Sequence, residues 1–266
     1  MDIRDLKSFI INLETKPEQY NILKNQLIEY GFNNIERWNA TVGKSLVPVI
    51  NKTSQLAENE VSVTLQAYID LNKGRTTHRS LSSQGALGCY MSHVNIWKWL
   101  LNQPNIDKVV VFEDDAIIVS EDRIKQINDS LNSITQPFDF FSFGYLNRDR
   151  GTLYNVNEYV SLYTGEFWGL QGYIITKSGV EKLLKYIFPI DVQLDSYIGL
   201  IADYDSSFTL YMTNKILIEQ RTHISTIQDI CVKCGIIDLY DIINKYKLIV
   251  ILLIIIIIIS IYKNFN

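Results

Sequence analysis

The chain has 266 residues, enough for one large domain or two small ones. Its composition, 47% apolar and 20% charged, is typical of a globular protein with a substantial core. The formal net charge of −4 predicts no strongly basic surface, which argues against nucleic acid as a partner.

The first 40 residues have the pattern of a strand, a helix and a second strand. Residues 8–13 and 34–40 predict the two strands. Between them, apolar side chains recur at the spacing of one helix face over residues 16–30, with Pro17 in the first turn and Gly31 after the last. This order favours a βαβ unit and a partly parallel sheet. The charged start of the chain and the short apolar run after it do not match a secretory signal peptide.

Residues 43–84 are polar and less regular, with one expected helix over residues 58–71. A segment of this length between core elements is usually functional or mobile, and a lid over a ligand is one hypothesis for it. Residues 85–101 then predict a helix with glycines at its start and aromatic side chains packed inward.

An apolar strand that ends in three consecutive acids is the most informative motif of the chain. Residues 109–112 are β-branched or aromatic and predict a buried strand. Glu113, Asp114 and Asp115 follow directly. Adjacent carboxylates repel one another and are costly to desolvate, so a divalent cation with hard oxygen ligands, Mg²⁺ or Mn²⁺, would make the cluster favourable. The alternative is structural, because acids after a strand also serve as helix caps or solvated turn residues.

Further strand and helix patterns follow the acids. Residues 138–145 and 169–176 predict strands, residues 177–186 a helix, and residues 210–218 a late strand. The alternation predicts a single α/β domain whose sheet is flanked by helices. Such open sheets bind ligands at the carboxyl ends of their strands, where the three acids are expected.

The end of the chain has a different character. Residues 248–262 carry no charged side chain, and lysines lie on both sides of them. As a helix this run rises about 22 Å, short of the roughly 30 Å hydrocarbon core, and snorkelling lysines and interfacial tyrosines can cover part of the difference. We therefore expect a main domain, 1–244, and a C-terminal hydrophobic helix, 245–266, that anchors it in a membrane. Without a signal peptide, such an anchor would leave the main domain in the cytosol. The alternative is a buried strand or a hydrophobic tail packed on the domain.

Several short motifs occur in a fixed order. A strand ending Ile-Asn-Leu comes first, then a Gly-x-x-Gly-Cys-x-x-Ser-His helix start with a tryptophan after it, then the Glu-Asp-Asp strand end. A Gly-x-x-Gly-Tyr strand and a Pro-x-Asp segment complete the series. They are Ile11–Leu13, Gly85–His93 with Trp97, Glu113–Asp115, Gly169–Tyr173 and Pro189–Asp191. This order resembles glycosyltransferase family 25, which includes bacterial lipopolysaccharide glycosyltransferases and procollagen galactosyltransferases. The resemblance covers roughly residues 8–227.

Two features depart from the family pattern. The family usually has arginines after Ile-Asn-Leu, whereas this chain has Glu14–Pro17 there. Lys16 supplies one basic group but not the bidentate phosphate grip of a guanidinium. Gln171 stands where the family often has a small residue.

The resemblance implies a GT-A type fold, with a Rossmann-like mixed sheet and flanking helices. It also implies an inverting, metal-dependent glycosyltransferase that moves a hexose from a nucleotide-sugar donor to a hydroxyl acceptor: a glycan, a lipooligosaccharide or other glycolipid, or protein hydroxylysine. Its metal would be Mn²⁺ or Mg²⁺. The alternative function is a non-catalytic, membrane-anchored protein that retains the fold and binds a nucleotide sugar or a glycan. A phosphotransferase would normally add a Gly-rich phosphate loop, and the sequence has none.

The resemblance also implies metal ligands. Asp115 is the first candidate and Glu113 the second, because alternate strand residues point the same way. Asp114 would face differently and contact ribose or sugar hydroxyls of the donor. His223 is a further candidate ligand, with a surface histidine as the alternative.

Four other residues are expected at the substrate. Asn12 and Leu13 belong to the first motif, and His93 and Tyr173 to the later ones. A hydrogen-bonded structural role is the alternative for His93, and a core position is the alternative for Tyr173.

The inverting reaction needs a base beside the acceptor hydroxyl. Asp191, expected at a helix start after Pro189, is the first candidate. Asp195 would share a helix face with it, and the neighbouring charge would raise the pKa of the base. A helix N-cap is the alternative role for Asp191.

Overall fold

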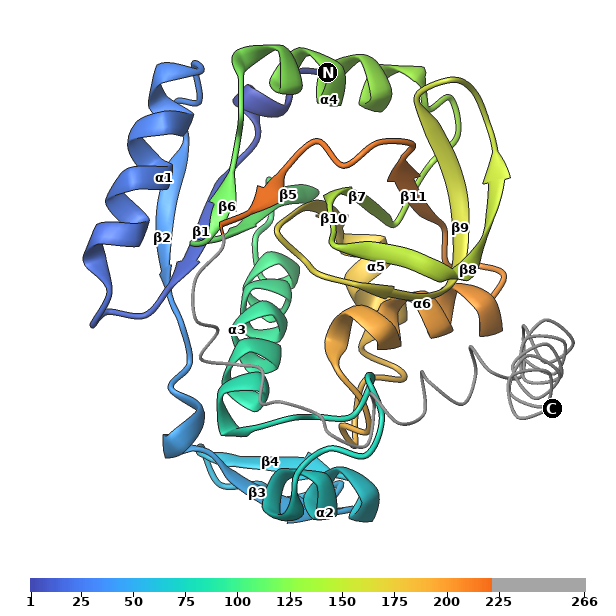
Figure 1. The fold of residues 1–266 in the computed structure, drawn as a ribbon. Coiled ribbons are helices and arrows are strands. Elements are labelled where there is room, and N and C mark those ends of the chain that lie inside the picture. The colour runs from blue at the N-terminus through green and yellow to red at the C-terminus, as the bar shows by residue number, and fades with distance from the viewer. Residues whose placement is uncertain (222–266) are drawn as a thin grey trace, which may run out of the picture.

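The computed structural model describes residues 1–221, which form a mixed α/β fold (Figure 1). The expected anchor, residues 245–266, and the candidate ligand His223 lie outside the described residues. Within the described range, no helix combines the length and the apolar character needed to cross a bilayer. The C-terminal hydrophobic helix therefore stays a prediction.

A mixed sheet forms the centre of the described fold. Its strands are β1 Ser8–Asn12, β2 Ile35–Asn39, β5 Lys108–Glu113, β7 Phe140–Gly144, β8 Asn147–Asn155, β9 Val160–Trp168, β10 Gly172–Thr176 and β11 Leu210–Thr213. They lie in the order β2-β1-β5-β10-β7-β11-β9-β8. β1 is parallel to β2 and β5, β10 is antiparallel to β5 and β7, and β11 is parallel to β7. β9 is antiparallel to β11 and β8. The prediction of a partly parallel sheet is confirmed.

Helices cover both faces of this sheet (Figure 1). α1 (Pro17–Glu29) and α4 (Glu121–Ser133) pack on one face, and α3 (Gln84–Leu101), α5 (Lys177–Leu183) and α6 (Leu194–Tyr204) pack on the other. Because β5 is covered on both sides, Val109 and Val111 belong to one core and Val110 and Phe112 to the other. This double burial explains the continuous apolar run in the sequence.

A small lobe lies outside the main sheet. It pairs β3 (Val47–Ile50) in parallel with β4 (Glu60–Val63), and α2 (Leu65–Lys73) follows. The helix expected over residues 58–71 is therefore wrong in its first part. The Thr64 hydroxyl accepts a hydrogen bond from the amide of Ala67 at 3.1 Å and starts the helix there.

The antiparallel hairpin of β8 and β9 at one edge of the sheet was not expected from the sequence. An edge strand needs only one apolar face and keeps polar side chains toward solvent, so β8 lacks the apolar run of β5. Helix α4, which is rich in polar residues, was likewise not expected.

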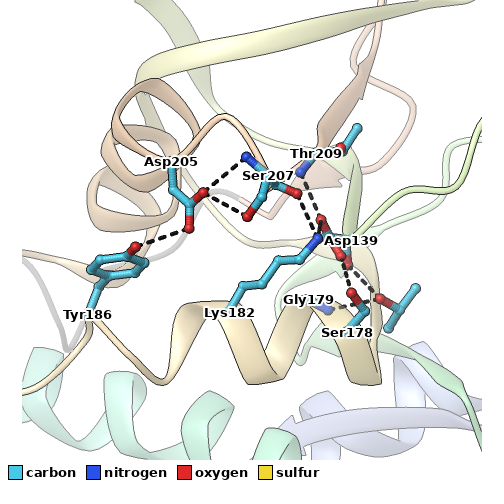
Figure 2. A network of polar contacts seen from close by, with 9 residues as sticks. Asp139, Ser178, Gly179, Lys182, Tyr186, Asp205, Ser207 and Thr209 are labelled. Atoms are coloured by element: carbon cyan, nitrogen blue, oxygen red, sulfur yellow. Dashed lines mark hydrogen bonds and ion pairs between the residues drawn. The ribbon is translucent and has the colours of Figure 1, made fainter.

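A polar network fastens α5 to two strands (Figure 2). The buried carboxylate of Asp139, just before β7, accepts hydrogen bonds from Lys182 Nζ at 2.6 Å, Ser178 Oγ at 2.8 Å and the amide of Thr209 at 2.9 Å. Lys182 also donates to the carbonyl of Ser207 at 2.6 Å. The charge of Asp139 is thus compensated inside the protein, and α5 is fixed on the sheet.

Candidate functional site

A pocket of about 420 Å³ opens at the carboxyl ends of β1 and β5. These strands are parallel neighbours, so their ends meet at one edge of the sheet, where the sequence placed the ligand site. The loop after β2 and the start of α3 form the other walls. The lining residues are Ile11–Leu13, Lys16, Gln19, Ala40–Lys44, Ser83–Gly85, Cys89, Ser92, Glu113–Asp115 and Gln220.

Close backbone packing builds the wall between the loop and α3. A Cβ atom on Gly88 would lie 2.5 Å from the carbonyl oxygen of Thr41, so only glycine allows this approach. The amide of Thr41 also donates to Ser92 Oγ at 2.8 Å. Two residues of the Gly-Cys-x-x-Ser-His motif, Gly88 and Ser92, therefore hold the pocket wall in place.

The three acids that line the pocket belong to two different elements, a strand and a turn. Glu113 is the last residue of β5, whereas Asp114 and Asp115 form the turn that leads to β6 (Ala116–Ile117). The argument from strand alternation therefore does not apply to Asp115. Asp114 Oδ2 accepts a hydrogen bond from Asn12 Nδ2 at 2.5 Å, and Asp115 Oδ2 accepts one from Gln220 Nε2 at 2.8 Å.

Glu113 lies in the most enclosed part of the cluster. Burial, and then the charge of Asp114, raise the pKa of its carboxyl to about 7. Its Oε1 atom lies 3.7 Å from Cys89 Sγ and 3.3 Å from His93 Nε2. The carboxylate thus faces α3 as well as the pocket.

His93 and Tyr173 lie behind the pocket wall. Both side chains are fully buried, and neither lines the pocket. His93 Nδ1 lies 2.8 Å from the Tyr173 hydroxyl, which also accepts a hydrogen bond from Trp97 Nε1 at 3.1 Å. Burial lowers the pKa of His93 to about 3, so the imidazole is neutral. In this structure His93 contacts Glu113 and Tyr173 contacts His93, and the expected contact of both residues with substrate stays a prediction.

Two sets of side chains have the composition of a metal site. Ligand atoms of Cys89, His93 and Glu113 lie within 4.8 Å of one another. In this structure both nitrogens of His93 are already hydrogen-bonded, and burial raises the pKa of the Cys89 thiol well above its usual value. This set therefore forms a hydrogen-bond cluster.

The second set contains only oxygen donors. Glu113, Asp114 and Asp115 line the pocket beside Asn12, whose Oδ1 atom is buried and has no hydrogen-bond partner among residues 1–221. Carboxylate and amide oxygens are the donors that Mg²⁺ and Mn²⁺ prefer, so these residues fit such an ion.

The two candidate bases lie in different environments. Helix α6 begins at Leu194, so Asp191 precedes it and does not share a helix face with Asp195, contrary to expectation. Asp191 Oδ1 accepts a hydrogen bond from the Thr64 hydroxyl at 2.6 Å, near the small lobe. Asp195 accepts from the amides of Gly169 at 2.8 Å and Ser196 at 2.7 Å.

Asp195 is the candidate that lies near the acidic cluster. Burial is the main cause of the lowered pKa of His93 and the raised pKa of Cys89, and the charge of Asp195 acts on both groups in favour of their protonated forms. The charge of Glu113 in turn acts on the pKa of Asp195 and raises it. Burial is the main cause that raises the pKa of Asp195 to about 6. A carboxylate of this kind can accept a proton near neutral pH.

The structure brings half of the predicted site residues together in the pocket, whereas Asp191 and Asp195 are not among its lining residues. Asn12 and Leu13 line the pocket with the three acids. Sequence reasoning missed Cys89 and Gln220 as pocket residues. Cys89 lies within a recognised motif, but Gln220 reaches the pocket only because β12 (Glu219–Gln220) pairs with β6.

Comparison with known proteins gives a consistent set of matches. The model of glycosyltransferase family 25, described as an LPS biosynthesis protein family, matches residues 5–198. Procollagen galactosyltransferase 1-A of Xenopus laevis is 30% identical over 218 residues, which are 76% of this chain and 33% of that protein. A glycosyltransferase 25 family member of Drosophila melanogaster is 26% identical over 201 residues, 73% of this chain and 30% of that protein.

Two further matches limit what these names imply. The probable inactive glycosyltransferase 25 family member 3 of Bos taurus is 23% identical over 197 residues, 69% of this chain and 30% of that protein. The chain thus spans about a third of the length of the curated relatives it matches. Among solved structures, the crystal structure of A197 from STIV aligns with 84% of this chain and 97% of that one at a TM-score of 0.36 and 12% identity, which is too low to bear on the argument.

Proposed function

Because this chain belongs to glycosyltransferase family 25, we propose that it transfers a hexose from a nucleotide-sugar donor to an acceptor hydroxyl with inversion at the anomeric carbon. The observation that carries the proposal is the pocket that Glu113, Asp114 and Asp115 line together. It lies at the edge of the sheet where open α/β folds bind ligands.

The donor binds in this pocket in our proposal. Lys16 and Lys44 line it and supply positive charge for a diphosphate. Asn12 fixes Asp114 by the hydrogen bond at 2.5 Å, which leaves the Asp114 carboxylate oriented for ribose or sugar hydroxyls. The residues that would hold the metal are Asp115 and Glu113, with His223 as a further candidate. The metal, Mn²⁺ or Mg²⁺, would stabilise negative charge on the departing diphosphate as a Lewis acid.

Asp195 is the base in this proposal, in preference to Asp191. Two backbone amides fix its carboxylate, and its pKa of about 6 leaves it ionised at neutral pH. An ionised carboxylate can take the proton of the acceptor hydroxyl as that oxygen attacks the anomeric carbon and the diphosphate leaves on the opposite side.

The acceptor is a hydroxyl of a glycan, a lipooligosaccharide or protein hydroxylysine. The names of the matched proteins support two of these classes, since one refers to procollagen and the family description refers to LPS. We also propose that residues 245–266 attach the chain to a membrane, with the main domain on the cytosolic side.

The test is a donor panel with the full-length chain in mild detergent. Nucleotide sugars plus Mn²⁺ should give slow donor hydrolysis or transfer, and EDTA or Asp115→Ala should abolish it. Asp195→Asn should keep donor binding and lower turnover about 100-fold or more, the usual scale of base catalysis. Asp203→Asn is the matched control, because Asp203 lies on the same helix with its side chain exposed.

Two results would contradict the proposal. Loss of turnover in Asp191→Asn but not in Asp195→Asn would move the base to Asp191. Donor binding without metal-dependent turnover of any donor would favour the second candidate, a non-catalytic binding protein. The match to a relative named as probably inactive is the observation that favours this second candidate.

A further inference from the structure

Four polar side chains cross the apolar core between α3 and the sheet in one continuous line. The line begins at Trp97, passes through the hydroxyl of Tyr173 and the imidazole of His93, and ends at the carboxylate of Glu113. The successive distances are 3.1 Å from Trp97 Nε1 to the hydroxyl, 2.8 Å from the hydroxyl to His93 Nδ1, and 3.3 Å from His93 Nε2 to Glu113 Oε1. The first three side chains are fully buried. Polar groups in such a position are kept only where each finds a partner.

The chemistry of the donors fixes the direction of this line. An indole N–H only donates, so the Tyr173 oxygen accepts from Trp97. The Tyr173 hydroxyl then donates its own proton to His93 Nδ1, which lies 2.8 Å away. A neutral imidazole that accepts at Nδ1 carries its proton on Nε2, and this proton points at Glu113.

We propose that Trp97, Tyr173 and His93 form a one-directional hydrogen-bond chain that positions the Glu113 carboxylate at the pocket. The chain holds His93 as the Nε2–H tautomer, and His93 donates to Glu113 Oε1. The thiol of Cys89 lies 3.7 Å from the same oxygen and adds a weak second donor. Both donors hold the Glu113 carboxylate with Oε1 turned toward α3. The catalytic consequence rests on the proposed function, but the direction of the chain does not.

A soft metal at Cys89, His93 and Glu113 would require the opposite arrangement. A metal on Nε2 leaves the histidine proton on Nδ1, where it would point at the Tyr173 oxygen. That oxygen already accepts from Trp97, and its own proton would then lack an acceptor among the described residues. The tautomer of His93 therefore separates the two arrangements.

The direct test is ¹⁵N NMR of the full-length chain, labelled at histidine and kept in mild detergent without added metal. The chain has three histidines, and His93→Gln identifies the signals of interest by their loss. We expect protonated Nε2 and unprotonated, hydrogen-bonded Nδ1. Tyr173→Phe should shift the Nδ1 resonance. Tyr90→Phe should not, although it removes another buried hydroxyl, one that donates to the Ile187 carbonyl at 2.8 Å.

A second measurement tests the positioning role. Tyr173→Phe keeps the ring that stacks on Phe140 at 4.6 Å, so the variant retains its packing. We expect its kcat to fall about 10- to 100-fold, the usual scale for a partner behind a site residue, with the KM for the donor little changed. Tyr90→Phe should keep the wild-type kcat.

The outcomes separate this inference from the proposed function. A protonated Nδ1, a doubly protonated ring, or Zn²⁺ that binds stoichiometrically and is lost in His93→Gln would overturn the chain. An Nε2–H tautomer together with wild-type kcat in Tyr173→Phe would overturn the positioning role. If no donor is turned over by the wild type, the proposed function fails, while the NMR result still decides the direction of the chain.

Discussion

Burial in the fold raises the free energy of the ionised Asp195 carboxylate. Hydrogen bonds from two backbone amides lower its pKa, but the loss of water around the carboxylate raises it by more, so the pKa is about 6. The same feature that suits a base therefore lowers the stability of the folded state above this pH. Groups of this kind are a common reason why binding and catalytic sites are less stable than the protein around them.

The first expected consequence is that activity and folding stability depend on pH in opposite directions. Activity, measured as kcat/KM, should rise with pH with an apparent pKa near 6, because only the ionised Asp195 accepts a proton. Stability should change in the opposite direction. The unfolded carboxyl ionises near pH 4 and the folded one near pH 6, so the folded state loses stability as pH rises through this window.

The variant Asp195→Asn tests the effect of the Asp195 charge on folding stability. At pH 8 the variant should be more stable than the wild type by about 2 kcal/mol, a figure that already allows for the loss of one hydrogen bond from a backbone amide. Near pH 4 this gain in stability should vanish. Urea unfolding at the two pH values measures it. An equal change at both values would mean that the charge of Asp195 is not the cause.

At the scale of elements, the sequence predicted most of the strands buried on both faces and the edge strand β2, but not the hairpin of β8 and β9 at the other edge. β1, β5 and β10 are continuous apolar runs because helices cover both of their faces. β8 carries polar residues at an edge, and β4 was mistaken for part of a helix because it is only four residues long. The acids were found because β5 ends abruptly at Glu113. The contact between His93 and Tyr173 that supports Glu113 was not predicted, because the two residues are 80 positions apart in sequence and only the order of strands brings them together.

The attachment of α5 gives the prediction at this scale. Lys182→Met removes the partner of the buried Asp139 charge, and breaking such a pair is typically costly, so stability should fall by about 3 kcal/mol. Lys185→Met, on an exposed lysine close by, is the control and should change stability by less than about 0.5 kcal/mol. Urea unfolding measures both. Donor binding should be unchanged in both variants, since neither lysine lines the pocket. A stable Lys182→Met protein would show that Asp139 does not need this partner.

At the scale of the whole molecule, the described fold is complete well before the apolar tail. The family match ends at residue 198, and the last described strand, β12, ends at residue 220. The pocket residues and the expected anchor therefore lie in separate parts of the sequence.

A chain that ends at residue 244 should consequently be recovered without detergent and still bind the donor. The full-length chain should sediment with membranes and resist extraction by high salt, because apolar burial rather than charge would hold it. Fractionation of cells that express each form, followed by a donor-binding assay, checks this. A shortened chain that aggregates would instead support the alternative of a tail packed on the domain.

The position of β10 also governs how the protein is made. β10 lies between β5 and β7, although it follows both of them in the chain. During translation, β5 and β7 emerge from the ribosome with open edges and no partner between them until residues 172–176 have followed. Open edges are prone to pair with the wrong strand, so this interval is when a nascent chain depends most on chaperones. Insertion of β10 also brings Tyr173 to His93, so the gap between β5 and β7 is filled and Glu113 gains its support in the same step.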